Sequence, residues 1–464
     1  MQEESRVSKK KSEKAAAEIA RILGSNRVVT DPDVLEGLAG DESVVAPVIP
    51  DAAVRAHSAA DIRVTLEVAA KMEVPVTPRA GGTGKAGGAI PIRGGLVLDT
   101  SKMNRILEID RANQIAVVEP GVITGVLQDT VDKEGLFYPP DPNSLETCCI
   151  GGNVAHNAGG PRAFKYGVTR NFVMGIETVL MGGELLPVGR RTVKCVAGTD
   201  LTGVMVGSEG TLGVFSKIRL ALTHRPEFLV TALVLFNDED AAGRAVANIT
   251  SSGLRPRVLE FMDRELTAVI RGAGVDMVPE GTAALLLAEL DGDHEVAVES
   301  DLDRLADICD AEDARDVLTA KHGGDRERLW SARRTLSDAV KARAKHKISE
   351  DIAVPRSKIP ELLATLKRLS EAHGLLIASY GHAGDGNFHV NVLWDDDNIN
   401  PEPAVEAVLR TAVDLGGTIT GEHGVGVAKK PYLHLERSPT QIDWMRRTKQ
   451  LFDPKGLLNP GKIF

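Results

Sequence analysis

Apolar and polar positions repeat with two periods along this 464-residue chain, and the periods separate helices from strands. A period near 3.6 indicates a helix with one apolar face, whereas strict alternation or a short apolar run indicates a strand. In the first half the pattern predicts helices at residues 11–23, 58–72, 124–134 and 200–205, strands at 74–77, 96–98, 114–119 and 216–222, and a hairpin at 173–188. In the second half it predicts strands at 229–235, 258–262, 283–290 and 352–355, and helices at 241–251, 266–271, 301–309, 326–343 and 358–373.

A hairpin with two histidines is predicted at residues 380–392, YGHAGDGNFHVNV. A Gly-Asp-Gly turn follows His382, and the alternation after it places His389 and Asn391 on one face of a strand. Two imidazoles on one side form part of a catalytic metal site, which also needs a third protein ligand. The motif GEHGVG at 421–426 offers Glu422 and His423. The residues alone leave open the alternative of hydrogen-bonded loop histidines.

Composition limits the possible classes of protein. The length predicts two or three domains, and mixed strands and helices with a hairpin in the second half predict an α+β sheet with helices on one face. A net charge of −10 and 4% aromatic residues argue against nucleic-acid binding. Four cysteines without a CxxC pair argue against structural zinc. With no apolar run of about 20 residues, we expect a cytoplasmic protein, at most peripheral at the inner face of a membrane.

Three glycine-dense segments carry the other chemistry. PRAGGTGKAGGAIP at 78–91 is not a P-loop, because Ala86 follows Lys85 where a P-loop has Ser or Thr. It is not a Rossmann turn either, because a strand and not a helix follows the segment. Its backbone N–H groups could form an anion nest for a pyrophosphate, with a merely flexible loop as the alternative. The second segment, 139–167, has a Gly151-Gly152-Asn153 turn and is predicted to contain no regular element, and the third is VGSEGTLGV at 206–214.

These three segments, followed by HAGDGNFH, GEHGVG and DPKGLLNPGK at 453–462, resemble the vanillyl-alcohol oxidase/p-cresol methylhydroxylase (PCMH) superfamily over about residues 40–464. The later motifs are similar to its branch of D-lactate dehydrogenases, glycolate oxidase FAD-linked subunits and D-2-hydroxyglutarate dehydrogenases. The resemblance implies an α+β protein with a two-part FAD-binding domain and an antiparallel-sheet cap domain. We expect an N-terminal helical segment at 1–40, the FAD-binding domain at 41–223, the cap domain with the metal site at 224–423, and a C-terminal helical segment at 424–464 that packs on the FAD-binding domain.

The resemblance implies FAD as cofactor, bound noncovalently because no histidine stands in the first glycine loop. Cys148 and Cys149 leave open whether a thiol touches the flavin. The positions that match FAD-binding residues of the family are Pro78, Arg79, Ala80, Gly81, Gly82, Thr83, Gly84, Gly87, Gly88, Pro140, Asp141, Gly151, Gly152, Asn153, Asn157, Gly159, Gly160, Tyr166, Gly167, Glu209, Gly210, Gly213 and Asn459.

The resemblance also implies one divalent metal with the ligands His382, His389 and Glu422. Two nitrogens and a carboxylate suit Zn²⁺ first, with Mn²⁺, Fe²⁺ and Co²⁺ compatible. His423 cannot easily share that metal, since adjacent residues of a strand point in opposite directions. We therefore expect His423 to act as the general base for the substrate hydroxyl, with a supporting hydrogen bond as the alternative role.

Substrate binding is predicted at the helix that contains WSAR, residues 330–333. Arg333 matches the Trp-x-x-Arg of the family and would bind the substrate carboxylate, because a guanidinium is a forked cation. Ser337 follows one helical turn later on the same side and would assist. Asn391 would orient the substrate or a ligand.

The function implied by the resemblance is oxidation of a D-2-hydroxy acid to the 2-oxo acid by FAD and a divalent metal. D-lactate or glycolate is favoured, because Ser349 stands where relatives selective for 2-hydroxyglutarate carry a lysine. D-2-hydroxyglutarate is the alternative substrate, and a flavin-dependent transferase of the alkyl-dihydroxyacetonephosphate synthase type is the alternative of another class. We expect a homodimer that passes electrons to an acceptor other than NAD, namely a quinone, a cytochrome or an electron-transfer flavoprotein.

Overall fold

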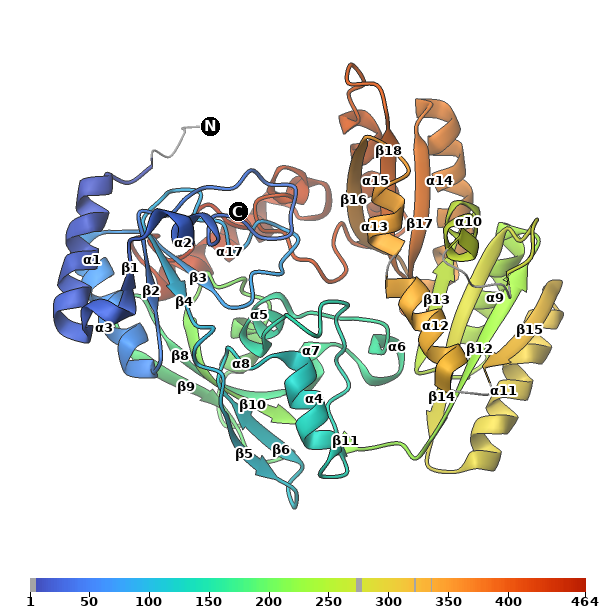
Figure 1. Cartoon of the computed structure of the whole chain (residues 1–464), viewed down its shortest axis with the longest axis horizontal. Helices are drawn as coiled ribbons and strands as arrows, with labels where there is room; N and C mark the ends of the chain where they lie inside the picture. Colours follow the sequence, from blue (N-terminus) through green and yellow to red (C-terminus); the bar gives the residue numbers. More distant parts are fainter. Residues whose placement is uncertain (1–5, 273–277, 321–322, 335) are drawn as a thin grey trace. The chain divides into compact units, whose positions relative to one another are not determined.

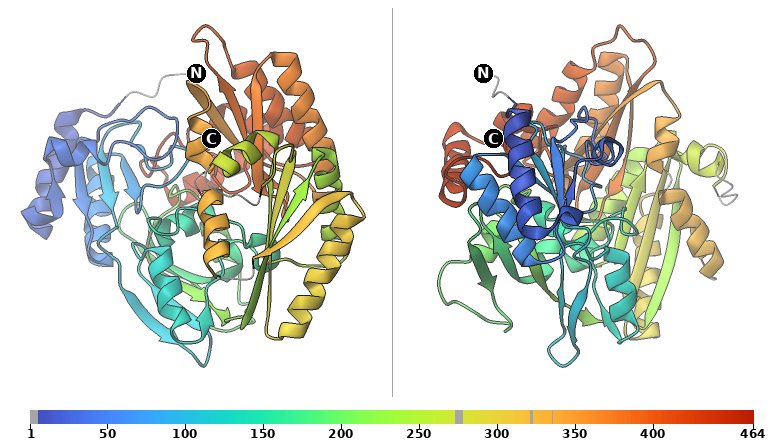
Figure 2. Two further views of the ribbon diagram at one scale, coloured as in Figure 1. Left: turned by 45° about the vertical axis from the view of Figure 1, so that its right-hand side comes forward. Right: turned by 60° about the vertical axis from the view of Figure 1, so that its left-hand side comes forward.

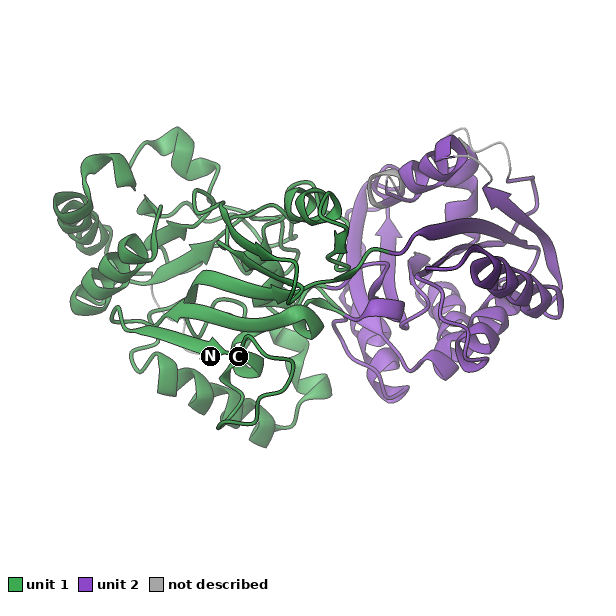
Figure 3. Ribbon diagram, turned by 90° about the horizontal axis from the view of Figure 1, so that it is seen from below, with its two compact units in different colours: residues 1–158, 168–225, 422–464 green, residues 159–167, 226–421 purple. Residues whose placement is uncertain are grey.

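The computed structural model describes residues 6–272, 278–320, 323–334 and 336–464, which form two compact units (Figure 3). Unit 1 contains the chain up to residue 158 together with residues 168–225 and 422–464. Unit 2 contains residues 159–167 and 226–421. The segment 159–167, which we expected in a domain spanning 41–223, therefore packs with unit 2. Among the described residues, none of the helices combines the length and the apolar character that crossing a membrane requires.

The elements of unit 1 are helices and mostly short strands (Figure 1). They are α1 (Lys9–Leu23), β1 (Val28–Val29), α2 (Pro32–Glu36), β2 (Ala52–Arg55), α3 (Ala59–Met72), β3 (Val76–Arg79), β4 (Leu96–Asp99), β5 (Ile106–Asp110), β6 (Ile115–Val118), α4 (Thr124–Asp132), β7 (Leu136–Phe137), α5 (Ile150–His156), α7 (Thr169–Phe172), β8 (Val173–Val179), β9 (Leu185–Gly189), α8 (Leu201–Met205), β10 (Val214–Ala221), β11 (Thr223–His224), α16 (Leu433–Glu436) and α17 (Pro439–Phe452).

Two larger sheets form the framework of unit 1. The first has the order β1-β2-β4-β3, and β2, β4 and β3 are parallel because α3 crosses over between β2 and β3. The second is antiparallel, with the order β5-β6-β10-β8-β9. Helices α1 and α3 pack on the first sheet, where Ile19, Leu66 and Leu96 are fully buried. The glycine loop after β3 is thus held at the carboxyl end of a buried parallel strand.

The elements of unit 2 follow one another as strands and helices of more usual length (Figure 1). They are α6 (Ala163–Tyr166), β12 (Phe228–Phe236), α9 (Glu239–Ser251), β13 (Val258–Met262), α10 (Arg264–Gly272), β14 (Ala284–Gly292), α11 (Glu295–Asp310), β15 (Ala314–Ala320), α12 (Gly323–Arg334), α13 (Leu336–Lys341), β16 (His346–Ala353), α14 (Ile359–His373), β17 (Leu376–His382), β18 (Asn387–Trp394) and α15 (Glu402–Asp414).

One seven-stranded sheet organises unit 2, with the order β15-β12-β14-β13-β17-β18-β16 and every pair antiparallel. Helices α9, α11, α14 and α15 cover one face (Figures 1 and 2). Helices α10, α12 and α13 lie on the other face, where Leu266, Leu329 and Leu336 join a core cluster with Leu285 of β14. The expectation of helices on one face only was wrong, because both faces of the central strands are apolar and each needs a cover.

The prediction that residues 139–167 contain no regular element was also wrong, because α5 and α6 lie within them. Gly151 and Gly152 sit in α5 instead of a turn. A Cβ on Gly151 would lie 2.6 Å from Cβ of Pro120, so glycine is needed there for close packing and not for reversing the chain. The helix ends where Asn157 adopts a left-handed conformation, φ 55° and ψ 48°.

The register of the unit 2 sheet collects polar residues on the face that α12 covers. Met262 pairs with Tyr380, and His389 pairs with both Tyr380 and Asp351. Because side chains alternate along each strand, Glu260 of β13 and His382 of β17 share this face with those residues. The predicted hairpin is confirmed as β17 and β18, with its turn at residues 383–386.

Candidate functional site

A cavity of about 380 Å³ in unit 1 is built around the glycine loop that follows β3. This volume falls within the range of small-molecule and cofactor pockets. Of the predicted FAD-binding residues, those that line it are Pro78, Arg79, Ala80, Gly81, Gly82, Thr83, Gly84, Gly88, Gly151, Gly152, Asn153, Glu209, Gly210 and Gly213. Glu422 and His423 line the same cavity.

Close backbone packing explains the glycines of the loop. A Cβ on Gly81 would lie 2.8 Å from the carbonyl oxygen of Thr147, and one on Gly88 would lie 2.9 Å from Nε2 of His156. Gly82 has a φ of +70°, a conformation that disfavours other residues. Side chains at these positions would push the loop away from α5.

Two C-terminal motifs are hydrogen-bonded to the walls of this cavity. The side-chain amide of Asn459 donates to the carbonyl oxygens of Gly88 at 3.0 Å and Glu209 at 2.8 Å. The Glu209 carboxylate in turn accepts from the N–H groups of Val425 at 2.8 Å and Gly426 at 2.7 Å. Residues more than 200 positions apart in the sequence therefore hold the glycine loop in place.

The residues of the cavity fit an anionic, polar cofactor such as FAD. Nδ1 of His156 lies 3.2 Å from the carbonyl oxygen of Gly152, while its Nε2 is buried and has no hydrogen-bond partner among the described residues. An orphaned polar atom beside a glycine cradle is what a cofactor with a pyrophosphate would use. Cys149 also lines the cavity, but burial raises the pKa of its thiol to about 12, so it remains protonated and is a poor nucleophile toward a flavin.

The remaining predicted FAD-binding residues do not line this cavity. Asn459 supports the loop from behind, as described above, and Asn157 ends α5 and accepts from N–H of Arg170 at 2.8 Å. Tyr166 lies in unit 2, where its hydroxyl donates to Asp291 at 2.7 Å. The other residues of this group are Gly87, Pro140, Asp141, Gly159, Gly160 and Gly167.

Several residues that line the cavity were missed. They include Glu42, Lys85, Thr100, Asn143, Ser144, Thr147, His156 and Phe215. Asn143, Ser144 and Thr147 follow the Pro-Asp-Pro run directly, so their place in the same loop was a usable signal. Phe215 directly follows VGSEGTLGV, so its position was a usable signal as well. Glu42 is separated from the glycine motifs in sequence, and only the fold brings it there.

In unit 2 the two candidate metal-binding histidines lie side by side. The ring centroids of His382 and His389 are 5.4 Å apart and the rings are nearly perpendicular. Both side chains are at least nine-tenths buried, with 5% and 8% of each residue exposed. The sequence placed them correctly on one face, because the alternation along β18 fixes the direction of His389.

A buried carboxylate faces Nδ1 of His382, and sequence reasoning missed it. Glu260 of β13 is fully buried, and one of its carboxylate oxygens contacts that nitrogen while the other accepts from Nε of Arg333 at 2.6 Å. Burial by itself raises the pKa of Glu260, but the charges of Arg333 and His382 and their hydrogen bonds outweigh it and lower the pKa to about 2. Glu260 is therefore an anion.

His389 has a carboxylate of its own at a longer distance. Nδ1 of His389 lies 3.9 Å from Oδ1 of Asp351, which is fully buried in β16. Asn387 donates to that carboxylate at 2.6 Å and Thr420 at 3.0 Å. The N–H of Gly421 donates to the carbonyl oxygen of Asp351 at 3.3 Å. Gly421 is the last residue of unit 2, so unit 2 ends beside Asp351, and the next residue in the chain is Glu422.

The predicted substrate-binding residues of unit 2 have different surroundings. Arg333 is 6% exposed, forms an ion pair with Glu260, and stacks over the ring of Tyr380 at 4.7 Å from the centroid. The amide nitrogen of Asn391 donates to the carbonyl oxygens of Ala378 and His389, and its Oδ1 is buried without a partner among the described residues. The side chain of Ser337 lies outside the described part of the chain.

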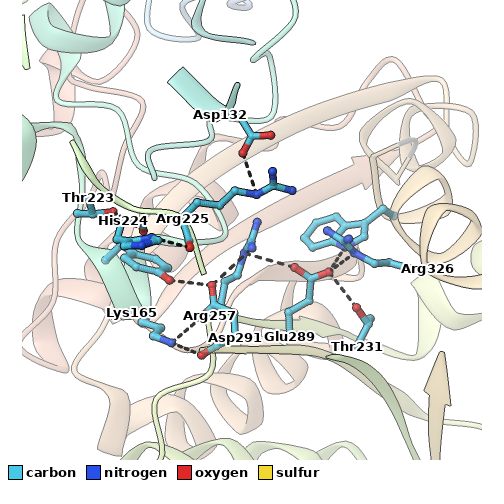
Figure 4. A network of polar contacts seen from close by, with 12 residues as sticks. Asp132, Lys165, Thr223, His224, Arg225, Thr231, Arg257, Glu289, Asp291 and Arg326 are labelled. Carbon is cyan, nitrogen blue, oxygen red and sulfur yellow. Dashed lines mark hydrogen bonds and ion pairs between the residues drawn. The ribbon is translucent and has the colours of Figure 1, made fainter. Parts of the chain in front are cut away.

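A second polar network holds α12 and α6 on the sheet of unit 2 (Figure 4). Glu289 of β14 accepts from Arg326 at 2.8 Å and from Trp330 at 2.7 Å, both on α12. Asp291, two residues along the same strand, forms an ion pair with Lys165 and accepts from Tyr166. Two side chains of the sheet, Glu260 and Glu289, thus hold the helix that carries Arg333 through hydrogen bonds.

The donor set of unit 2 fits a transition metal. When Nδ1 of His382 donates to Glu260, its Nε2 keeps the lone pair that a metal requires, and such carboxylate–histidine pairs are the usual support of metal-binding imidazoles. Imidazole ligands suit Zn²⁺ and its neighbours better than Ca²⁺ or Mg²⁺.

The comparisons with known proteins agree with this architecture. Residues 50–189 match the FAD binding domain family, and residues 225–463 match the family of FAD linked oxidases, C-terminal domain. The chain is 41% identical to the glycolate oxidase subunit GlcD of Bacillus subtilis (strain 168), over 90% of this chain and 89% of that protein. It is 34% identical to D-lactate dehydrogenase of Anaerostipes hadrus, over 95% of each chain.

A solved structure has the same fold at low identity. The 4-ethylphenol oxidase from Gulosibacter chungangensis superposes with a TM-score of 0.80 and 20% identity, over 98% of both chains. The predicted α+β fold of the PCMH type and the prediction of FAD as cofactor are therefore confirmed. This chain belongs to the FAD-linked oxidase family and is an FAD-linked oxidoreductase of the type that includes glycolate oxidase and D-lactate dehydrogenase subunits.

Proposed function

We propose that this protein oxidises a small D-2-hydroxy acid, D-lactate or glycolate, to the 2-oxo acid with FAD and one divalent metal ion. The observation that carries the proposal is the pair of buried histidines, His382 and His389, each with Nδ1 facing a buried carboxylate. The names of the two relatives, a glycolate oxidase subunit and a D-lactate dehydrogenase, favour the same substrate class.

The reaction would remove the hydroxyl proton and a hydride from C2 of the acid. FAD when bound would accept the hydride, and a bound metal would polarise the hydroxyl. His382, His389 and Glu422 would hold the metal, with Zn²⁺ ahead of Mn²⁺, Fe²⁺ and Co²⁺. His423 would take the hydroxyl proton as general base, since an imidazole titrates near neutral pH.

Recognition of the acid would rest on unit 2. Arg333 would bind the carboxylate through Nη1, the guanidinium nitrogen that Glu260 does not contact, with Ser337 assisting. Asn391 would orient the substrate through its unpartnered Oδ1, which can accept a hydrogen bond from the hydroxyl. Ser349 pairs with Asn391 across β16 and β18 and brings no positive charge for a second carboxylate, which favours a monoacid over D-2-hydroxyglutarate.

FAD would be held noncovalently in the cavity of unit 1, since no histidine stands in the glycine loop at 78–91 and the Cys149 thiol that lines the cavity stays protonated. The electrons would leave the flavin for an acceptor other than NAD: a quinone, a cytochrome or an electron-transfer flavoprotein. Acid precipitation tests the first point, because it releases a noncovalent flavin into the supernatant and leaves a covalent one in the pellet.

A substrate screen tests the proposal directly. Anaerobic protein loaded with Zn²⁺ or Mn²⁺ is mixed with D-lactate, glycolate, their L-counterparts where they exist, and D-2-hydroxyglutarate, and bleaching of the flavin absorbance is followed. We expect D-lactate or glycolate to bleach it fastest and a redox dye to be reduced in turnover. Failure of every 2-hydroxy acid would exclude the proposal, and preference for D-2-hydroxyglutarate would exclude its monoacid part. His389→Ala should lose metal and turnover yet stay yellow.

A further inference from the structure

We infer that Glu260 is a positioning residue that holds His382 in the tautomer able to bind a metal and fixes Arg333 against the same carboxylate. The inference rests on the proposed function, because it assumes that His382 is a metal ligand. It assigns to Glu260 a role in metal affinity that goes beyond the stability of the fold.

Glu260 is placed for this role by the sheet. It lies on β13, whose residues Phe261 and Met262 pair with Gly381 and Tyr380 of β17. In this antiparallel register Glu260, the residue before Phe261, lies opposite His382. The carboxylate is fully buried, and both of its oxygens are used, one by Nδ1 of His382 and one by Arg333. One side chain thus connects a strand of the histidine hairpin with the last turn of α12.

The chemistry of an ionised carboxylate determines the tautomer of the ring. A carboxylate only accepts hydrogen bonds, so Nδ1 of His382 must carry the hydrogen that it donates to Glu260. The proton of a neutral imidazole is then absent from Nε2, which keeps its lone pair for a metal. Arg333 supplies the positive charge that keeps the buried carboxylate ionised.

Glu260→Gln is the informative variant because it preserves shape and reverses one hydrogen bond. The glutamine oxygen can still accept from Arg333, which leaves its amide group facing His382. An amide donates, so Nδ1 of His382 must become the acceptor and the ring hydrogen moves to Nε2. The metal must then compete with that hydrogen.

Glu289 offers a matched control on the neighbouring strand. It is also buried, at 1% exposed, and it also binds residues of α12, namely Arg326 and Trp330 (Figure 4). None of its hydrogen bonds among the described residues reaches a histidine of the hairpin. Glu289→Gln therefore disturbs the attachment of α12 while leaving the environment of His382 unchanged.

The experiment measures the Zn²⁺ affinity of full-length, FAD-loaded, metal-stripped protein by competition with a chromophoric chelator. For Glu260→Gln we expect the Zn²⁺ dissociation constant to rise about 10- to 100-fold, the effect usual for such supporting carboxylates. FAD content should equal that of the wild type. Glu289→Gln should lower the melting temperature and leave the dissociation constant within about twofold.

A measurement on the wild type reports the tautomer of His382 directly. In the metal-free protein labelled with ¹⁵N-histidine, at a pH high enough to keep the ring neutral, the signal that disappears in His382→Ala should report hydrogen on Nδ1 and none on Nε2. A neutral ring with its hydrogen on Nε2 would overturn the inference, as would equal Zn²⁺ affinity of the wild type and Glu260→Gln. A wild type that binds no Zn²⁺, Mn²⁺, Fe²⁺ or Co²⁺ at all would instead overturn the proposed function.

Discussion

The guanidinium of Arg333 is buried, so its charge depends on a few contacts. Its partners are Glu260 on one side and the face of Tyr380 on the other. Such a pair gains little net stability over apolar residues, but removing one partner leaves an uncompensated buried charge. The guanidinium nitrogen that Glu260 does not contact, Nη1, is the part of the side chain that a substrate carboxylate would use.

Substitution of Arg333 separates these two roles. Arg333→Met should lower the free energy of unfolding by roughly 3–5 kcal/mol, because Glu260 loses its counter-charge. Arg333→Lys should recover most of that stability, since an ammonium also pairs with Glu260. It should still raise the KM for the hydroxy acid at least tenfold, because a lysine cannot bind two carboxylates as a fork. Urea unfolding and steady-state kinetics provide the measurements, and an unchanged KM in Arg333→Lys would exclude Arg333 from substrate binding.

At the residue scale, the sequence predicts the positions of side chains that follow from strand alternation or from a motif. It does not predict contacts between strands, because these depend on the register of the sheet. His382 and His389 were assigned to one face because a strand repeats every two residues. Glu260 stands in VLEFM, where a glutamate among apolar residues has no spacing relation to any histidine. Only the pairing of β13 with β17 brings Glu260 to His382.

At the element scale, α10 begins from a carboxyl group buried between two strands. Asp263, which follows β13, accepts hydrogen bonds from the backbone N–H of Ser379 and from that of Leu266 at 3.2 Å. Burial raises the pKa of Asp263 to about 7, even though the Ser379 N–H opposes the rise, and the charge of Glu239 adds to it. The folded protein therefore keeps a proton that the unfolded chain loses near pH 3.8.

This proton gives unfolding a defined pH dependence. Between pH 3.8 and about 7 the native state binds more protons at Asp263 than the unfolded state does, so this contribution to stability falls as the pH rises. Asp263→Asn should remove the dependence. Relative to Asp263→Asn, the wild type should lose up to roughly 1.4 kcal/mol of unfolding free energy per pH unit in this window. Urea unfolding followed by circular dichroism at pH 5 and pH 7.5 tests it, and parallel pH profiles of the two proteins would contradict it.

The local sequence of α5 explains why a turn was predicted there. Two glycines before an asparagine are typical of turns, and no apolar period is visible over seven residues. The glycines lie in the helix because Pro120 packs closely on Gly151 and the glycine loop packs on the same helix. Tertiary packing thus overrode a local preference that would otherwise have been correct.

At the scale of the whole molecule, unit 1 is assembled from three separate stretches of the chain and unit 2 from two (Figure 3). The order of the motifs indicated the family and hence the fold, but not which stretches touch. Asn459 binds Gly88 and Glu209 across 371 and 250 positions. No local pattern encodes such contacts, because their partners are fixed by the topology of the sheets.

This discontinuous assembly predicts how FAD and the proposed metal would each protect the chain from hydrogen exchange. Adding FAD to the apoprotein should slow exchange at residues 78–89, 149–156 and 209–213 together, since one cavity of unit 1 is lined by all three. Adding Zn²⁺ should slow exchange at residues 376–394 of the histidine hairpin, with little effect on the glycine loop. Mass spectrometry of peptic peptides resolves these segments, and His389→Ala is the control, because it should lose the Zn²⁺ effect and keep the FAD effect. Protection of the hairpin by Zn²⁺ in that variant would show that the metal binds elsewhere.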